Sequence, residues 1–435
     1  MFIFTYFLII FLKSVISKLS FHFTRNITKD LSPSNLMDNL FKNDIITFFE
    51  IGHQKQKIPI SIKLQNYYFY IYSSPSNPKY NFLALNQQKS FLQINNLRNL
   101  LYNENDNNTF FSSDIISFSN KKNKFNFLLI KNVSESEFYK SGILGLNIKG
   151  NKSNEELNFI NQLKEKNLIS SYSFSIKYKN ENENEGDLII GKRPDEYDNK
   201  YKINNLHKIK VPIYKNEFDW GINFDSIEYG ELDIYKLETK FGFFEIELGI
   251  IVGTVDYKFA IEKNFFNKYI KENRCFVGRI KGDEVKVTGF KYYYCNEDVN
   301  ISDMKNLTFF SKELNYNFTF NYKDLFYNFN GKNYFLVIFP WFMGIQWRLG
   351  LPFFKKYEFV FNSDKKIIGV YDKVLEVNII LQNSWKNNLI ILLFVIISFM
   401  TFFIYKIYIH KPRKIRANEL KDNYEYIPEI IDFKN

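Results

Sequence analysis

Short runs that alternate apolar and polar residues fill the chain between residues 58 and 372. They include "IPISI" from Ile58, "KFNFLLI" from Lys124, "SYSFSIKY" from Ser171 and "DLIIG" from Asp187. Alternation with a period of two is the pattern of a strand with one buried face, and Asn, Asp, Lys and Gly between the runs favour turns. The pattern therefore predicts a mainly β body that is too long for one sandwich.

Helical periodicity is confined to a few segments. Residues 154–169 and 258–273 carry apolar residues at helical spacing and predict two helices. The charged run "NENENEG", residues 180–186, predicts a hairpin turn. The stretch "WRLGLPFFKKYEFVFNSDKKIIGVY", residues 347–371, contains three apolar runs with an acidic-basic turn before the last, so it predicts paired strands whose aromatic residues pack in the sheet.

The two ends of the chain carry uninterrupted apolar stretches. Residues 1–17 combine an apolar run with small residues and predict a signal peptide. Residues 389–405 contain no charge and are long enough to cross a membrane. Basic residues follow directly, which predicts a single-pass type I protein with a cytosolic tail over 406–435 and a lumenal or extracellular body in the secretory pathway or at the cell surface. A buried core helix is the alternative for 389–405.

The composition of the chain narrows the range of partners and cofactors that it is expected to bind. The chain has 45% hydrophobic residues, 19% aromatic residues and a formal charge of +11. The Lys residues are scattered among Asp and Glu, so a nucleic-acid partner is not expected. Four His without ligand spacing predict no metal site, and no cofactor motif stands out. Cys275 and Cys295 predict a disulfide, and seven Asn-x-Ser/Thr sequences permit glycosylation.

Five features, in order, resemble the pepsin-like aspartic proteases. They are "FYKSGILGLNIKG" (138–150), the hairpin over 174–197, "VPIYKNEFDWGINFDSIEYG" (211–230), the pair Cys275 and Cys295, and the closing stretch 347–371. The resemblance implies a bilobal β fold with a central cleft that holds a peptide. The implied division is a lead-in or pro-like segment over 18–57, a first lobe over 58–205 and a second lobe over 206–378.

The family's reaction uses two aspartates, one per lobe, each in an Asp-Thr/Ser-Gly turn. Two carboxylates about 3 Å apart share one proton, so one acts as base and the other as acid. This chain contains no such turn. By the resemblance, Ser73 takes the first aspartate position and Glu247 the second. A serine cannot replace a carboxylate, and the longer side chain of Glu247 displaces the acid.

Three further residues are expected to contact a substrate or ligand. Ser76 belongs to the first altered turn, Gly249 to the second, and Tyr102 matches the family's flap tyrosine. Because both catalytic positions are altered, we expect an inactive member that binds a peptide or protein. An active, divergent endopeptidase that uses Glu247 is the alternative. A trafficking role through the tail sequence Tyr424-Glu425-Tyr426-Ile427 is a third possibility.

Overall fold

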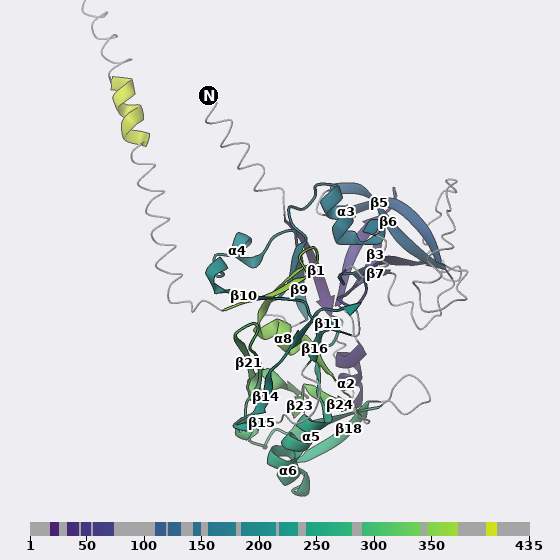
Figure 1. The fold of residues 1–435 in the computed structure, drawn as a ribbon, viewed down its shortest axis with the longest axis vertical. Helices are drawn as coiled ribbons and strands as arrows, with labels where there is room; N and C mark the ends of the chain where they lie inside the picture. Colours follow the sequence, from purple (N-terminus) through teal and green to yellow (C-terminus); the bar gives the residue numbers. More distant parts are fainter. Residues whose placement is uncertain are drawn as a thin grey trace, which may run out of the picture. The chain divides into compact units, whose positions relative to one another are not determined.

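The computed structural model describes 14 segments of the chain, and the predicted signal peptide lies outside them. The segments are 18–25, 33–42, 45–53, 55–73, 109–118, 121–131, 142–148, 155–179, 184–214, 217–233, 241–280, 289–340, 346–372 and 397–406. The chain divides into two compact units, Met1–Lys373 and Val374–Asn435. The first unit carries the β-rich body, as the alternating pattern predicted (Figure 1).

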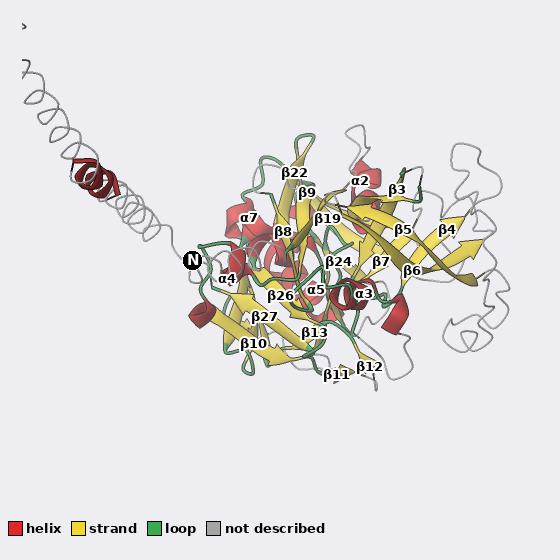
Figure 2. Ribbon diagram, turned by 90° about the horizontal axis from the view of Figure 1, so that it is seen from above, coloured by secondary structure: helices red, strands yellow, loops and turns green. Residues whose placement is uncertain are grey.

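A twelve-stranded sheet runs through the body in the order β10-β27-β26-β8-β9-β1-β2-β3-β7-β4-β6-β5. Its strands are β1 (Leu19–Arg25), β2 (Ile45–Ile51), β3 (Gln56–Lys63), β4 (Phe69–Ser73), β5 (Thr109–Phe118), β6 (Lys121–Lys131), β7 (Gly142–Gly145), β8 (Ser173–Tyr178), β9 (Glu185–Ile190), β10 (Leu206–Lys210), β26 (Glu358–Asn362) and β27 (Ile367–Tyr371). The late strands β26 and β27 pair with β8 and β10, so the sheet joins the two halves of the sequence (Figure 2).

The second half of the body forms three smaller sheets. A nine-stranded sheet holds β13 (Gly221–Asn223), β16 (Phe241–Phe244), β17 (Ile251–Val252), β18 (Cys275–Ile280), β19 (Phe290–Asn296), β22 (Phe326–Phe329), β23 (Lys332–Phe335), β24 (Val337–Pro340) and β25 (Trp347–Leu349). A four-stranded sheet holds β14 (Ser226–Tyr229), β15 (Leu232–Asp233), β20 (Leu307–Ser311) and β21 (Tyr316–Phe320), and a two-stranded sheet holds β11 (Ile213–Tyr214) and β12 (Glu217–Phe218).

Short helices cover the sheets. They are α2 (Pro33–Lys42), η4 (Glu155–Leu157), α3 (Phe159–Glu165), α4 (Pro194–Tyr197), η5 (Ile203–Asn205), α5 (Val255–Ile261), η6 (Glu262–Phe266), α6 (Asn267–Lys271), η7 (Ile301–Asp303), α7 (Tyr322–Leu325) and α8 (Leu351–Lys356). The helices predicted over 154–169 and 258–273 are confirmed by η4–α3 and by α5–η6–α6. The predicted hairpin around 180–186 is also confirmed, because β8 and β9 pair antiparallel.

The closing stretch corrects one detail of the prediction. The hairpin is present, since β26 and β27 pair antiparallel around the Asp364 turn. Residues 351–356 instead form α8, which has Pro352 in its first turn and buries Phe353 and Phe354. Proline is well tolerated in a first helical turn, where its missing N–H would have had no intrahelical partner.

In the segment predicted as a lead-in, 18–57, the described residues pair and pack with the rest of the body. β1 pairs with β9 from Leu19 to Thr24, and its apolar residues alternate inward. Helix α2 contacts β18 and packs Leu36, Met37 and Leu40 into an apolar cluster of the second half. These contacts make the segment part of the core.

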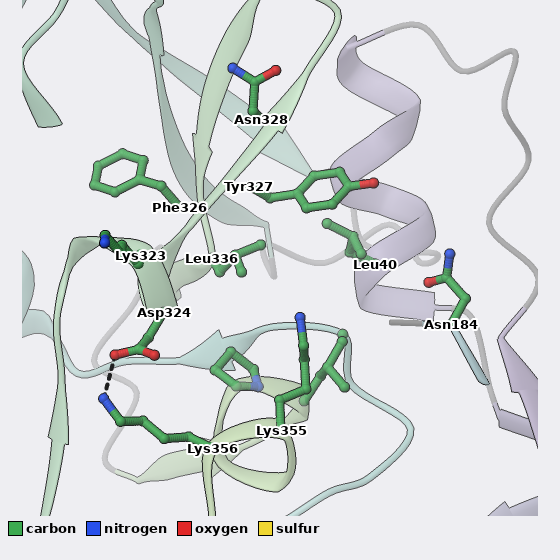
Figure 3. Close-up of a pocket in the computed structure, with 13 residues that line it drawn as sticks. Leu40, Asn184, Lys323, Asp324, Phe326, Tyr327, Asn328, Leu336, Lys355 and Lys356 are labelled. Carbon is green, nitrogen blue, oxygen red and sulfur yellow. Dashed lines mark hydrogen bonds and ion pairs between the residues drawn. The ribbon is translucent and has the colours of Figure 1, made fainter. Parts of the chain in front are cut away.

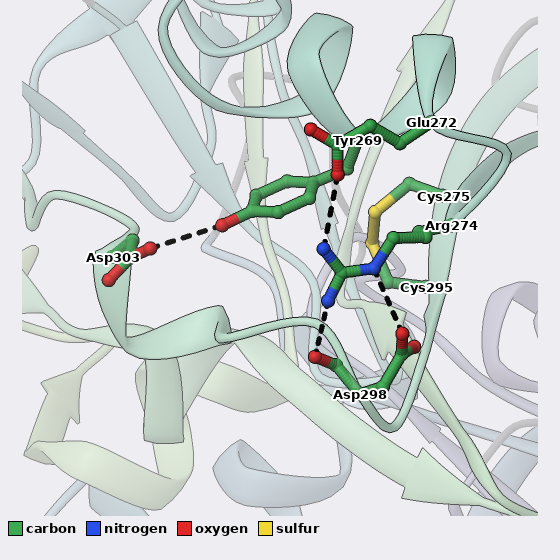
Figure 4. Close-up of a disulfide and its surroundings, with 7 residues drawn as sticks. All are labelled: Tyr269, Glu272, Arg274, Cys275, Cys295, Asp298 and Asp303. Atoms are coloured by element: carbon green, nitrogen blue, oxygen red, sulfur yellow. Dashed lines mark hydrogen bonds and ion pairs between the residues drawn. A yellow bond between two sulfur atoms is a disulfide. The ribbon is translucent and has the colours of Figure 1, made fainter.

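The predicted disulfide between Cys275 and Cys295 is confirmed. The two residues are directly opposite on β18 and β19, and both are buried (Figure 4). Next to the bridge, the Arg274 guanidinium donates to the Asp298 carboxylate at 2.9 Å and to Glu272 at 3.1 Å. The bridge joins β18, the strand that follows α6, to its neighbour β19 in the nine-stranded sheet.

The second unit is described only over residues 397–406, a helical stretch with exposed side chains. The rest of the predicted spanning segment 389–405 lies outside the described residues. Within the described part of the chain, no helix reaches the length and apolarity needed to cross a membrane.

Candidate functional site

Two turns of the body have the same backbone arrangement. The first turn (residues 63–68) connects β3 to β4, and β7 lies between these strands, parallel to β3 and antiparallel to β4. The second turn (residues 245–250) connects β16 to β17, and β25 lies between them in the same two senses. Beyond these, β4 pairs in parallel with β6, and β17 with β24. The two halves therefore repeat one motif.

The register identifies equivalent residues in the two turns. Lys63 is opposite Gly145 in the β3–β7 ladder. Phe244 is opposite Leu349, so the next residue, Glu245, falls opposite Gly350, and its N–H donates to the Leu349 carbonyl at 3.0 Å. We infer that Lys63 and Glu245 occupy equivalent positions at the starts of the two turns.

The two glycines support this equivalence. A Cβ at Gly145 would lie 2.5 Å from the carbonyl oxygens of Asn66 and Tyr68, and a Cβ at Gly350 would press on those of Leu248 and Ile250. In each turn, these carbonyls belong to the residues three and five positions after Lys63 or Glu245. Only a residue without a side chain fits where the crossing strand passes so close to the turn.

This register revises the expected positions of the dyad. Ser73 lies at the far end of β4, opposite Lys131 of β6, and not in the first turn. Glu247 lies inside the second turn, two residues after Glu245. The sequence places the first position after the apolar run of β4 and the second inside the turn after β16. From the pairing with β7 and β25, we infer that Lys63 and Glu245 take these positions.

Of the three residues expected to contact a ligand, one lies within the described part of the chain. Ser76 and Tyr102 lie outside the described residues. Gly249 is described, and its N–H donates to the carbonyl of Leu40 in α2 at 2.7 Å. A Cβ at Gly249 would lie 2.9 Å from that same oxygen. The absence of a side chain at Gly249 therefore allows α2 to pack directly against the second turn.

The Glu245 carboxylate is buried and held on both sides. The residue is 2% exposed. Its Oε1 accepts from Arg348 Nε at 2.7 Å and from Gln65 Nε2 at 2.5 Å, and Arg348 Nη2 forms an ion pair with Oε2. Gln65 belongs to the first turn, so this hydrogen bond joins the two turns. Arg348 and Gln65 thus hold the Glu245 carboxylate by charge-assisted hydrogen bonds from two elements.

Each turn is also held through a backbone carbonyl by a side chain from another element. In the second turn, Arg25 of β1 donates to the carbonyls of Ile246 and Glu247, both at 2.8 Å, and Arg25 is 3% exposed. In the first turn, the Asn147 amide donates to the carbonyl of Gln65 at 3.0 Å. Arg25 is thus a charged clamp on the second turn, and Asn147 is a neutral clamp on the first.

Tyr178 lies fully buried close to the second turn. Burial raises its pKa above the ordinary tyrosine value. The positive charge of the nearby Arg25 lowers the pKa in part, and the charge of Glu247 raises it further. Tyr178 is therefore a neutral phenol at physiological pH, and it supplies no charge to the site.

This arrangement differs from a pair of carboxylates that share a proton. Lys63 puts an amine where a first carboxylate would stand, and neither turn contains an aspartate. Glu245 has the acidic group, but its oxygens are engaged by Arg348 and Gln65. A general base needs a free lone pair directed at the water that it activates. Among the described residues, the first turn therefore offers no carboxylate to pair with Glu245.

The repeated strand–turn–strand motif, the sheet that joins both halves and the disulfide hairpin define a two-lobed protein of the aspartic protease class. The family model described as eukaryotic aspartyl protease matches residues 76–372, about two thirds of the chain. The chain belongs to this family. The match includes the second turn and begins after the first. No curated protein matches the chain.

Sequence reasoning missed Lys63, Gln65, Glu245 and Arg348. Glu245 directly follows an apolar strand, and Lys63 directly follows another, so each marks the end of a buried run. The clearest signal was Arg348, a charge in the otherwise apolar "WRLG" segment. A charge within an apolar strand favours a countercharge close by, and Glu245 is that countercharge.

Proposed function

We propose that this aspartyl protease homologue does not cleave peptides and that its body binds a peptide or protein ligand. The observation that carries the proposal is the engagement of Glu245 by Arg348 and Gln65, with Lys63 at the equivalent position of the other turn. Peptide hydrolysis in this family requires a shared proton between two carboxylates. With an amine in place of one carboxylate, the first turn offers no carboxylate that could share a proton with Glu245.

The fold supports a binding role because the backbone of both turns is kept. Gly145 and Gly350 are retained where the crossing strands press on the turns. We place the ligand in the cleft that the family fold implies between the lobes. We also propose that residues 389–405 anchor the body as a single-pass type I protein, and the Cys275–Cys295 disulfide is in keeping with folding in the secretory pathway.

Proteolysis of a peptide library tests the proposal. The purified full chain is incubated with the library between about pH 3 and 7, a range that spans ordinary carboxyl pKa values. We expect no cleavage above that of a sample without protein. Variants Glu245→Gln and Glu247→Gln are compared with Glu231→Gln, an exposed residue outside both turns. Cleavage by the parent that either turn variant abolishes, and that Glu231→Gln retains, would overturn the proposal in favour of a divergent endopeptidase.

Binding of a statine-type peptide gives a second readout. An active enzyme binds such a transition-state mimic far more tightly than the matching amide peptide. We expect the two peptides to bind equally, because no carboxylate pair distinguishes them. Preferential binding of the statine peptide that is lost in Glu245→Gln would contradict the proposal.

Membrane attachment is tested by extraction of cell membranes with alkaline carbonate. We expect the full chain to stay with the membrane and a chain that lacks residues 389–405 to be released. Release of both chains would exclude the anchor without affecting the proposal on proteolysis.

A further inference from the structure

A cavity in the second half of the body lies apart from the residues that hold the Glu245 charge. Its volume is about 480 Å³, and residues of α2, α7, β22 and α8 line it together with Asn184 from the β8–β9 hairpin and Gly249 from the second turn (Figure 3). Cavities of about 300 to 1,000 Å³ are the usual size for small-molecule ligands. Its lining includes none of Lys63, Gln65, Glu245 or Arg348.

The charged groups around the cavity are unequal in sign. Lys323, Lys355 and Lys356 line it together with a single carboxylate, Asp324. Asp324 is already engaged, because its Oδ2 accepts from the backbone N–H of Asn321 at 2.8 Å and pairs with Lys356 Nζ at 2.5 Å. Among the described lining residues, lysines thus outnumber carboxylates three to one, which favours an anion.

Apolar side chains form the other part of the lining. Leu40, Phe326, Leu336 and Leu351 contribute to it, and Figure 3 shows the Lys355 side chain extending from α8 toward Leu40 and Leu336. The side-chain amides of Asn184 and Asn328 add neutral donors. Apolar walls with a few polar groups of one sign are typical of sites that bind a ligand by an apolar group and orient it by a charged one.

We propose that this cavity binds a small organic anion, an apolar group that carries a carboxylate or a phosphate. The lysine ammonium groups act on the anionic head as compact point charges, a role lysine serves for both kinds of head group. Leu40 and Gly249 join α2 to the second turn, so a ligand in contact with both strengthens this packing.

Calorimetric titration of the full chain tests the proposal with two anions and one cation of similar size. The anions are phenyl phosphate and phenylacetate, and the cation is benzylamine. We expect saturable binding of at least one anion and none of benzylamine. The tighter anion identifies the head group, and equal affinities mean that the site recognises the negative charge alone. Binding of benzylamine as tight as that of the anions would overturn the proposal, as would the absence of saturation by both anions up to about 10 mM.

Charge reversal separates this site from a general attraction to a basic surface. Lys355→Glu and Lys323→Glu are compared with Lys365→Glu, an exposed lysine in the turn between β26 and β27. We expect each cavity variant to weaken anion binding at least about tenfold, because a repulsive charge replaces an attractive one. The Lys365→Glu variant should stay within about twofold of the parent. Equal losses in all three variants would mean surface attraction and overturn the proposal.

The results of the anion-binding experiments are independent of the results of the proteolysis experiments. Glu245 is held by Arg348 and Gln65, which do not line the cavity, and neither test depends on the other. An active protease with an anion site would show both cleavage and anion binding. An inactive homologue without the site would show neither.

Discussion

The first and second turns share a backbone and differ in charge. Each begins where one strand ends, each is crossed by a glycine, and each is held by a side chain from outside. The first begins with Lys63 and is held by a neutral amide, whereas the second begins with Glu245 and is held by two arginines. The comparison separates what the fold requires from what the chemistry requires. The glycines meet a steric demand of the fold, whereas the side chains that begin and hold the two turns differ in charge without changing the backbone.

The largest effect is expected from a methyl group at the crossing glycines. In Gly350→Ala the new Cβ would collide with the carbonyls of Ile250 and Leu248, and in Gly145→Ala with those of Asn66 and Tyr68. We expect Gly350→Ala to lower the free energy of unfolding by about 3 kcal/mol or more, and Gly145→Ala by somewhat less. Urea unfolding followed by tryptophan fluorescence measures both. An unchanged midpoint for either variant would show that its turn does not need glycine.

A smaller loss is expected when the Glu245 carboxylate loses its countercharge. Arg348→Met removes the guanidinium and leaves a carboxylate that is 2% exposed with the amide of Gln65. Breaking a buried pair costs about 3 to 5 kcal/mol, and Arg348 is partly exposed, so we expect about 2 to 3 kcal/mol. The double variant Glu245→Gln/Arg348→Met should recover part of the loss. If the two single losses simply add, the two residues do not interact in solution.

The sequence predicted those parts of the fold that depend on neighbours along the chain. The hairpins β8–β9 and β26–β27, the two helical segments and the disulfide were all visible as local patterns. The role of residues 18–57 was not, because β1 pairs with β9, far along the chain. α8 was read as a strand because its aromatic residues are buried on more than one side. The positions of Lys63 and Glu245 depend on the register with β7 and β25, which no local pattern contains.

The smallest losses in the free energy of unfolding are expected from the two side chains that hold the turns by their backbone carbonyls, Arg25 and Asn147. They also give the most direct contrast between the two turns. Arg25→Met removes the two hydrogen bonds to the carbonyls of Ile246 and Glu247 at a position that is 3% exposed. Hydrogen bonds from charged groups contribute about 1.5 to 3 kcal/mol, so we expect a loss of about 2 kcal/mol in the free energy of unfolding. Asn147→Ala removes one neutral bond to the carbonyl of Gln65, and about 1 kcal/mol is expected.

The order of these two losses distinguishes between two roles for Arg25. If Arg25 only fills space, methionine keeps most of its packing, and Arg25→Met costs no more than Asn147→Ala. If it clamps the turn, the loss is larger, and Arg25→Lys restores only part of it because an ammonium cannot copy the planar fork that reaches both carbonyls. Amide hydrogen exchange locates the effect, because the N–H of Gly249 should exchange faster in Arg25→Met and that of Gly145 should not. Faster exchange at Gly145 would mean that the two turns open together, through the hydrogen bond between Gln65 and Glu245.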